Sequence, residues 1–78
     1  MTSIATFYSH FGAIRFKRTC ESLGAKADVM PVPRNLSSSC GTCVRFEGSY
    51  PTPIPQEVEQ IVLVTPDGYQ LLYRAEDA

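Results

Sequence analysis

The chain has 78 residues, of which 44% are hydrophobic and 19% charged, and its formal net charge is -1. A chain of this length forms one domain that hides only about 60 to 65% of its unfolded surface, and its composition is that of a folded globular protein rather than a disordered one. The balance of basic and acidic residues excludes a broad cationic surface, so we expect no nucleic-acid partner.

The N-terminal sequence MTSIATFYSHF lacks a basic segment followed by a long apolar run. No stretch approaches the roughly 20 apolar residues of a membrane span, so we expect a cytoplasmic protein with no membrane partner. Three cysteines cannot all pair within one chain, and a reducing compartment would keep them as thiols. The cysteines therefore indicate reactivity or burial.

The first half of the chain predicts a strand, a helix and a second strand. Residues 4–8 form a short apolar, β-branched and aromatic run that is typical of a buried strand. Ser9 is a suitable N-cap for a helix, and Gly24 stands where a glycine commonly ends one. Between them, one apolar stripe recurs at steps of three, four and three and comprises Ala13, Phe16, Cys20 and Leu23. We expect Cys20 to be an inert core residue.

The short connection after the helix predicts that residues 26–32 form a strand parallel to the first one. Two prolines, Pro31 and Pro33, cannot donate ladder hydrogen bonds, so this strand should end there or lie at an edge. Val44 and Phe46 alternate with charged residues, as in a half-buried strand, and the alternation puts Cys43 on the face opposite Val44.

The second half of the chain gives conflicting signals. Residues 48–55 contain three prolines and predict a rigid connector, and residues 65–68 (TPDG) predict a turn. Between them, residues 56–64 place Val58, Ile61 and Val62 on one helical face, yet IVLV is also a good strand. The last strand, residues 69–73, should present Tyr69, Leu71 and Tyr73 on one face.

These elements predict an α+β fold in a single domain, residues 1–78, with a frayed tail at residues 75–78. With a helix at residues 56–64 the fold is a small ferredoxin-like βαββαβ sandwich with an antiparallel sheet. With a strand there, it is βαβ followed by a C-terminal β-hairpin. The sequence leaves both arrangements open, together with pairing of two copies into a homodimer through an edge strand.

The segment PVPRNLSSSCGTCVRF, residues 31–46, has no apolar helical period and predicts a functional loop between two strands. Cys40 and Cys43 are close enough in sequence for a turn to bring their sulfurs together. Hydroxyls, backbone N–H groups, a permissive glycine and cations could stabilise a thiolate on Cys40. The residues that supply these groups are Ser37, Ser38, Ser39, Gly41, Arg34 and Arg45. His10, at the start of the predicted helix, is a candidate neighbour.

Two other interpretations of the cysteine pair find little support. A Cys-Gly-x-Cys pair is typical of thioredoxin-type redox sites, but there the pair opens a helix, whereas a strand follows here. A zinc site would need more ligands, and His10 and Cys20 stand at a spacing that matches no familiar arrangement. We therefore expect no metal, and no Ser-His-Asp or paired-carboxylate set supports a hydrolase.

Several segments together resemble the selenium/sulfur carrier-like protein family. They are ATFYSHFGAIRFKR at the strand-to-helix junction, VMPVPR before the loop, SSSCG at its core and the VRF that follows, within residues 4–47. The resemblance implies a ferredoxin-like fold and one important cysteine, which by position is Cys40. It also implies a non-enzymatic carrier, with no cofactor other than a sulfur or selenium atom held on Cys40 as a persulfide or selenopersulfide.

Such a carrier would take its cargo from a donor protein such as a cysteine desulfurase and pass it to an unidentified acceptor protein. Cys43 departs from the family pattern, because it adds a second thiol three residues after Cys40. This thiol could attack a persulfide on Cys40, release the cargo and leave a disulfide. The alternative is a thiol-disulfide redox protein that uses the Cys40–Cys43 pair.

Overall fold

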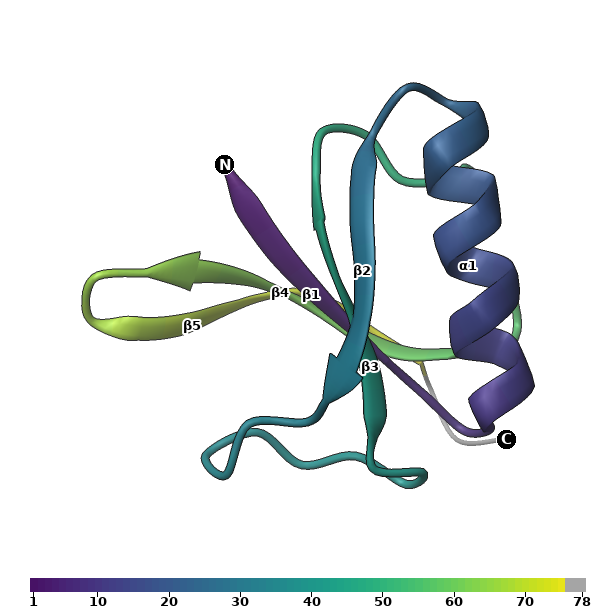
Figure 1. Ribbon diagram of the computed structural model, residues 1–78. Coiled ribbons are helices and arrows are strands. Elements are labelled where there is room, and N and C mark those ends of the chain that lie inside the picture. Colours follow the sequence, from purple (N-terminus) through teal and green to yellow (C-terminus); the bar gives the residue numbers. More distant parts are fainter. Residues whose placement is uncertain (76–78) are drawn as a thin grey trace.

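The computed structural model describes residues 1–75 of the protein (Figure 1). This part of the chain folds into one helix packed against a five-stranded sheet, which confirms the α+β class. In chain order the elements are β1 (Thr2–Phe7), α1 (His10–Ser22), β2 (Lys26–Pro31), β3 (Thr42–Glu47), β4 (Val58–Thr65) and β5 (Gly68–Arg74).

The sheet has the strand order β2-β3-β1-β4-β5, and every neighbouring pair is antiparallel. Because β1 and β2 both run antiparallel to β3, they are parallel to each other, as predicted, and β3 lies between them. β2 is an edge strand and ends at Pro31, which also agrees with the prediction. The loop that follows β2 therefore leaves the sheet at an edge (Figure 1).

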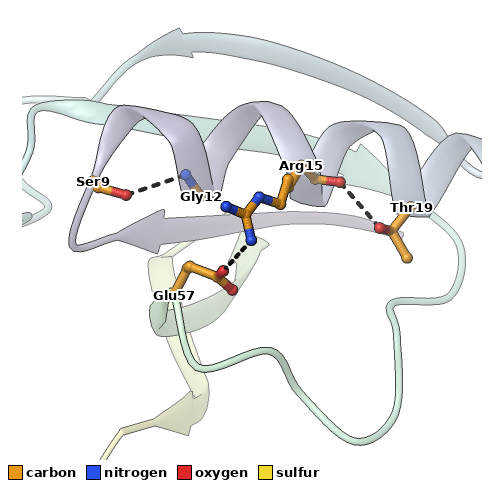
Figure 2. A network of polar contacts seen from close by, with 5 residues as sticks. All are labelled: Ser9, Gly12, Arg15, Thr19 and Glu57. Carbon is orange, nitrogen blue, oxygen red and sulfur yellow. Dashed lines mark hydrogen bonds and ion pairs between the residues drawn. The ribbon is translucent and has the colours of Figure 1, made fainter.

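Helix α1 begins and ends where the sequence predicts. Ser9 is the N-cap, and its Oγ accepts a hydrogen bond from the N–H of Gly12 at 3.2 Å (Figure 2). Gly24 has a φ of 86°, the left-handed conformation that a glycine after a helix adopts without strain. Cys20 is buried as expected, but Leu23 is 54% exposed because it lies beyond the last helical residue.

Gly12 lies where the helix meets the connector that precedes β4. Arg15 Nη1 donates to Glu57 Oε1 at 2.9 Å across this contact (Figure 2). A Cβ added at Gly12 would lie 2.5 Å from the Cβ of Glu57, which is too close for two carbon atoms. The helix therefore needs glycine at this position despite its low helix propensity.

We expect Gly12→Ala to destabilise the protein. Overpacking costs about 1 to 3 kcal/mol, which outweighs the gain of up to about 1 kcal/mol from replacing a helical glycine. Urea unfolding followed by circular dichroism should show a lower free energy of unfolding. Arg18→Ala, on an exposed position of the same helix, is the control and should change it by less than about 0.5 kcal/mol. An increase in stability for Gly12→Ala would contradict the packing described here.

The sheet has an apolar cluster on each face. On the helix side, Phe7, Phe16 and Phe46 form a chain of edge-to-face rings with centroid separations of 5.2 and 5.3 Å. On the opposite face a smaller cluster is made of Ile4, Cys43 and Val62. Loop residues after β2 help to cover that second cluster, so the sheet is buried on both faces near its centre.

Alternation along β3 follows the prediction. Val44 and Phe46 are buried on the helix side, and Arg45 and Glu47 are exposed. Cys43 lies on the face opposite Val44, as expected, but it is fully buried there. β3 is therefore buried on both faces near its start, with Val44 in the helix-side cluster and Cys43 in the smaller one.

The predicted helix at residues 56–64 is wrong, because residues 58–65 form β4. The βαββαβ ferredoxin-like arrangement is therefore not formed, and the alternative with a C-terminal hairpin describes the second half. Ile61 packs on the helix side and Val62 on the other face, so the apolar run fills both faces of a strand beside β1. The turn at residues 65–68 reverses the chain, so that β5 pairs with β4 as a hairpin.

The prediction that Tyr69, Leu71 and Tyr73 share one face is wrong for Tyr73. Val62 pairs with Leu71 but Ile61 pairs with Tyr73, so the register shifts by one residue at that point. The irregularity turns Tyr73 toward the helix-side cluster, while Tyr69 packs on the opposite one.

The end of the predicted frayed tail, residues 76–78, lies outside the described residues. Ala75 is described, and its N–H donates to the carbonyl oxygen of Glu59 at 2.9 Å, so this residue is attached to β4. Within residues 1–75 the structure contains no helix with the length and apolar character needed to cross a membrane.

Candidate functional site

The thiol loop, which we define as residues 32–41, connects β2 to β3 and closes on itself at its base. The N–H of Val32 donates to the carbonyl oxygen of Gly41 at 3.1 Å, so the two ends of the loop are held together. Gly41 has a φ of 74°, a conformation that is strained for residues with a side chain. The closed base places Cys40 beside the first residue of β3.

Two side chains of β4 hold the thiol loop against the sheet. The Glu59 carboxylate accepts two hydrogen bonds from Ser39, one from its Oγ at 2.5 Å and one from its backbone N–H at 3.1 Å. Gln60 Nε2 donates to the carbonyl oxygen of Ser37 at 2.8 Å. Thr6 Oγ1, on the central strand, donates to Glu59 Oε1 at 3.2 Å and so helps to fix the carboxylate. The loop is therefore clamped next to its cysteine.

Cys40 is the half-buried thiol of the protein. Its Sγ donates to the carbonyl oxygen of Thr42 at 3.4 Å, and its N–H donates to Ser38 Oγ at 3.4 Å. The side chain packs against the helix-side cluster. His10 Nδ1 lies 3.3 Å from Thr42 Oγ1, so the structure brings the predicted neighbour to the residue that Cys40 contacts.

Cys20 and Cys43 are fully buried and free. Burial, with a smaller contribution from Cys40, raises the pKa of the Cys43 thiol to about 11. Burial also raises the pKa of Cys20 to about 11, with a smaller contribution from Glu21. Both thiols therefore stay protonated near neutral pH and are poor nucleophiles.

The two predicted arginines lie apart from this hydrogen-bonded network. Arg34 is exposed in the thiol loop, and Arg45 lines a separate pocket of about 230 Å³ together with Lys26 and Asp28. Within the described residues, neither guanidinium forms a hydrogen bond or an ion pair. The polar contacts around Cys40 come instead from serine, threonine and backbone groups.

A polar pocket of about 430 Å³ opens beside the clamped part of the thiol loop. Its lining includes Glu59, Ser39 and Arg74, and it reaches Tyr8 at the end of β1. Ser37 and Ser39 thus line a space that a partner's side chain or a small molecule can enter.

Sequence reasoning missed the residues that hold the loop, which are Thr6, Glu59 and Gln60. Glu59 reaches the loop only because residues 58–65 form a strand beside β1 and not a helix. Glu59 accepts its hydrogen bonds from Ser39, which lies twenty residues earlier in the sequence. No local pattern identifies such a contact.

Within residues 1–75, no group of three or more His, Cys, Asp or Glu side chains is placed to hold a metal ion. The search of curated proteins found no match for this chain, and the search of solved structures found none either. A family model described as "Putative Se/S carrier protein-like" matches residues 2–63, from β1 through most of β4, and includes the whole thiol loop. The chain therefore belongs to the Se/S carrier-like family.

Proposed function

We propose that the protein carries a sulfur or selenium atom on Cys40, as a persulfide or selenopersulfide. The observation that carries the proposal is the contrast among the three thiols: Cys40 is partly exposed on a surface loop, whereas Cys20 and Cys43 are fully buried. A carrier needs one thiol that partners can reach and no competing nucleophile on its surface. Membership of the Se/S carrier-like family supports this function.

Loading and unloading are two thiol exchange steps. The Cys40 thiolate attacks the terminal sulfur of a persulfide on the donor, the donor's S–S bond breaks, and the donor cysteine leaves as a thiolate. In unloading, an acceptor thiolate attacks the terminal sulfur on Cys40, and Cys40 leaves as a thiolate. Each step moves one sulfane sulfur and needs no external oxidant or reductant. A terminal selenium atom follows the same course.

The Cys40 thiol donates to the carbonyl oxygen of Thr42, so in this proposal nearby donors turn toward the anion after loading. Ser38 Oγ lies beside the backbone N–H of Cys40, and the pocket next to the loop contains further hydroxyl groups. In this proposal hydroxyl and backbone N–H groups of the loop stabilise the terminal anion, and two arginines supply positive charge when a partner is bound. The loop residues are Ser37, Ser38, Ser39 and Gly41, and the arginines are Arg34 and Arg45. In the same proposal His10 is the neighbour that acts on the site through Thr42, whose Oγ1 lies 3.3 Å from His10 Nδ1.

In this proposal the donor and the acceptor are proteins, in keeping with the carrier-like family to which the chain belongs. A cysteine desulfurase, which forms a persulfide on its own cysteine, is a donor of the required chemistry, and the acceptor must present a nucleophilic thiol. The protein then acts as a non-enzymatic carrier with no resident cofactor. The pocket of about 430 Å³ beside Ser39 gives such a partner access to the loop.

The proposal is tested by loading the protein from a cysteine desulfurase and free cysteine, or from a selenium donor. Intact-mass spectrometry should show one added sulfur or selenium atom that a reductant removes. Cys40→Ser should reduce this adduct at least about tenfold, while Cys20→Ser, which removes a buried thiol, should load as the wild type does. Equal loading of Cys40→Ser would refute the assignment of Cys40.

One observation favours the thiol-disulfide alternative as a second candidate. Cys40 and Cys43 stand at the base of the thiol loop, three residues apart in sequence, and both are free thiols. Redox function would require a reversible Cys40–Cys43 disulfide with a potential in the cellular range. Equilibration with glutathione buffers followed by mass spectrometry tests this requirement, and a bond that forms only with strong oxidants would exclude it.

A further inference from the structure

The thiol loop acts as a cover for Cys43. Val32 and Leu36, both in the loop, pack on the small cluster that contains Cys43, Ile4 and Val62. Cys43 is 0% exposed, and its Sγ faces the carbonyl oxygen of Pro31 at 3.6 Å. The loop that presents Cys40 to partners therefore also hides the second thiol from solvent.

The side chains of Cys40 and Cys43 pack on opposite faces of the sheet. Cys40 packs against the helix-side cluster, whereas Cys43 belongs to the cluster on the opposite face. In this closed arrangement both thiols donate to separate carbonyl oxygens, and neither is bonded to the other. A change in the loop is required before Cys43 can reach Cys40.

Glu59 is the main polar attachment of the loop near Cys40. It holds both the hydroxyl and the N–H of Ser39, the residue that precedes Cys40, and Thr6 orients the carboxylate. Glu59 also lines the open pocket beside the loop, so a partner's hydrogen-bond donors can compete for it there. The contact is therefore well formed in the closed state and also open to competition from a partner.

We propose that Glu59 is a positioning residue that latches the thiol loop over Cys43, so that cargo on Cys40 is kept until a partner displaces the loop. The proposal rests on the carrier function proposed above. Opening of the loop frees Ser39 from Glu59, uncovers Cys43 and lets the second thiol approach Cys40. Gln60, which holds Ser37, supports the same closed state.

The chemistry of the open state is balanced without a further reagent. The Cys43 thiolate attacks the Sγ of the Cys40 persulfide, an S–S bond forms between the two cysteines, and the bond to the terminal sulfur breaks. The terminal sulfur leaves as hydrosulfide and is reduced, while the Cys43 sulfur is oxidised. The proton of Cys43 passes to the released sulfide. With selenium as cargo, the product is hydroselenide.

The first test needs no cargo and therefore does not depend on the carrier function. Timed alkylation of the folded protein, read by peptide mass spectrometry, measures how often Cys43 becomes accessible. Loss of the hydrogen bonds at Glu59 should increase the alkylation rate of Cys43 in Glu59→Ala about tenfold to a hundredfold. Glu59→Gln keeps one acceptor oxygen and should give an intermediate rate. Glu57→Gln, which alters a nearby carboxylate that binds Arg15 instead, is the matched control and should not increase it.

The second test measures retention of cargo after loading and separation from the donor. Glu59→Ala should release sulfide about tenfold faster than the wild type and accumulate a Cys40–Cys43 disulfide. Adding Cys43→Ser to this variant should restore slow release, which a general loss of stability would not do. If Glu59→Ala does not fold, Ser39→Ala, which removes one of the two bonds to Glu59, serves in its place.

The outcomes separate the latch from the carrier function. Failure of the wild type to load would refute the carrier function and leave the alkylation test of the latch intact. Unchanged alkylation of Cys43 in both Glu59→Ala and Ser39→Ala would refute the latch even if loading succeeds. Fast release that persists when Cys43 is replaced by serine would also refute it, because the second thiol would then have no part in the release.

Discussion

Alkylation of the folded protein at pH 8 will modify one cysteine, Cys40, long before the other two. Cys20 and Cys43 are 0% exposed, and burial raises the pKa of each to about 11. At pH 8 a thiol with that pKa is only about 0.1% thiolate, whereas a thiol with the unshifted pKa of about 9 is about one tenth thiolate. Since the thiolate is the reacting form, folding alone should slow these two thiols at least about a hundredfold.

The measurement is a time course with iodoacetamide in buffer and in urea, with each cysteine followed by peptide mass spectrometry. Cys40→Ser should remove the fast phase seen in buffer, and Cys43→Ser should leave it in place. Labelling of Cys43 in buffer at the rate seen in urea would contradict the buried placement. This prediction does not depend on sulfur chemistry, so it tests the contrast among the thiols from which the carrier function is argued.

The first half of the fold was predictable because its signals are local. Ser9 caps the helix by accepting a hydrogen bond from Gly12, only three residues away. Gly24 follows the end of the helix in a conformation that depends on that residue alone. The alternation along β3 likewise shows in adjacent residues, and Pro31 marks the end of an edge strand. Each of these features depends only on residues that are close together in the sequence.

The second half was harder because its outcome depends on distant partners. In residues 56–64, Ile61 and Val62 fit one helical face, but they also fit the two faces of a strand that lies beside β1. Helices this short gain little stability by themselves, so the neighbouring strand decides the conformation. The shift that turns Tyr73 to the other face is likewise set by pairing with β4.

The candidate site shows the same division. Cys40 and the serines before it were identifiable from composition within one loop. The hydrogen bonds that Ser39 and Thr6 donate to Glu59 join segments 20 and 53 residues apart, so only the folded sheet brings them together. The burial of Cys43 was also unexpected, because alternation gave its face correctly but could not show that the thiol loop covers that face.

Stability will fall as the pH rises from about 9 to about 11, because the two buried thiols must lose their protons. In the folded state Cys20 and Cys43 have a pKa of about 11, against about 9 for the same groups unfolded. Within this window the unfolded chain binds fewer protons than the folded one, so the free energy of unfolding decreases with pH. Their stabilising contribution is complete below pH 9 and lost above pH 11.

The expected loss is large for a domain of 78 residues. Two pKa units correspond to about 2.7 kcal/mol for each thiol, and a protein of this size has a total stability of about 4 to 12 kcal/mol. Urea unfolding at pH 8 and at pH 11, followed by circular dichroism, should show this decrease. Cys20→Ala and Cys43→Ala should each reduce the decrease by about half, whatever their own cost in stability at pH 8.

A variant that combines Cys20→Ala with Cys43→Ala is the reference for this experiment, because tyrosine and lysine side chains also titrate between pH 9 and 11. The decrease that remains without either buried thiol belongs to those groups, and the difference from the wild type belongs to the cysteines. An equal decrease in the wild type and the double variant would show that the buried thiols are not responsible. The expected result also limits how thiol transfer can be assayed. Because high pH weakens the fold that covers Cys43, loading and release should be measured near neutral pH.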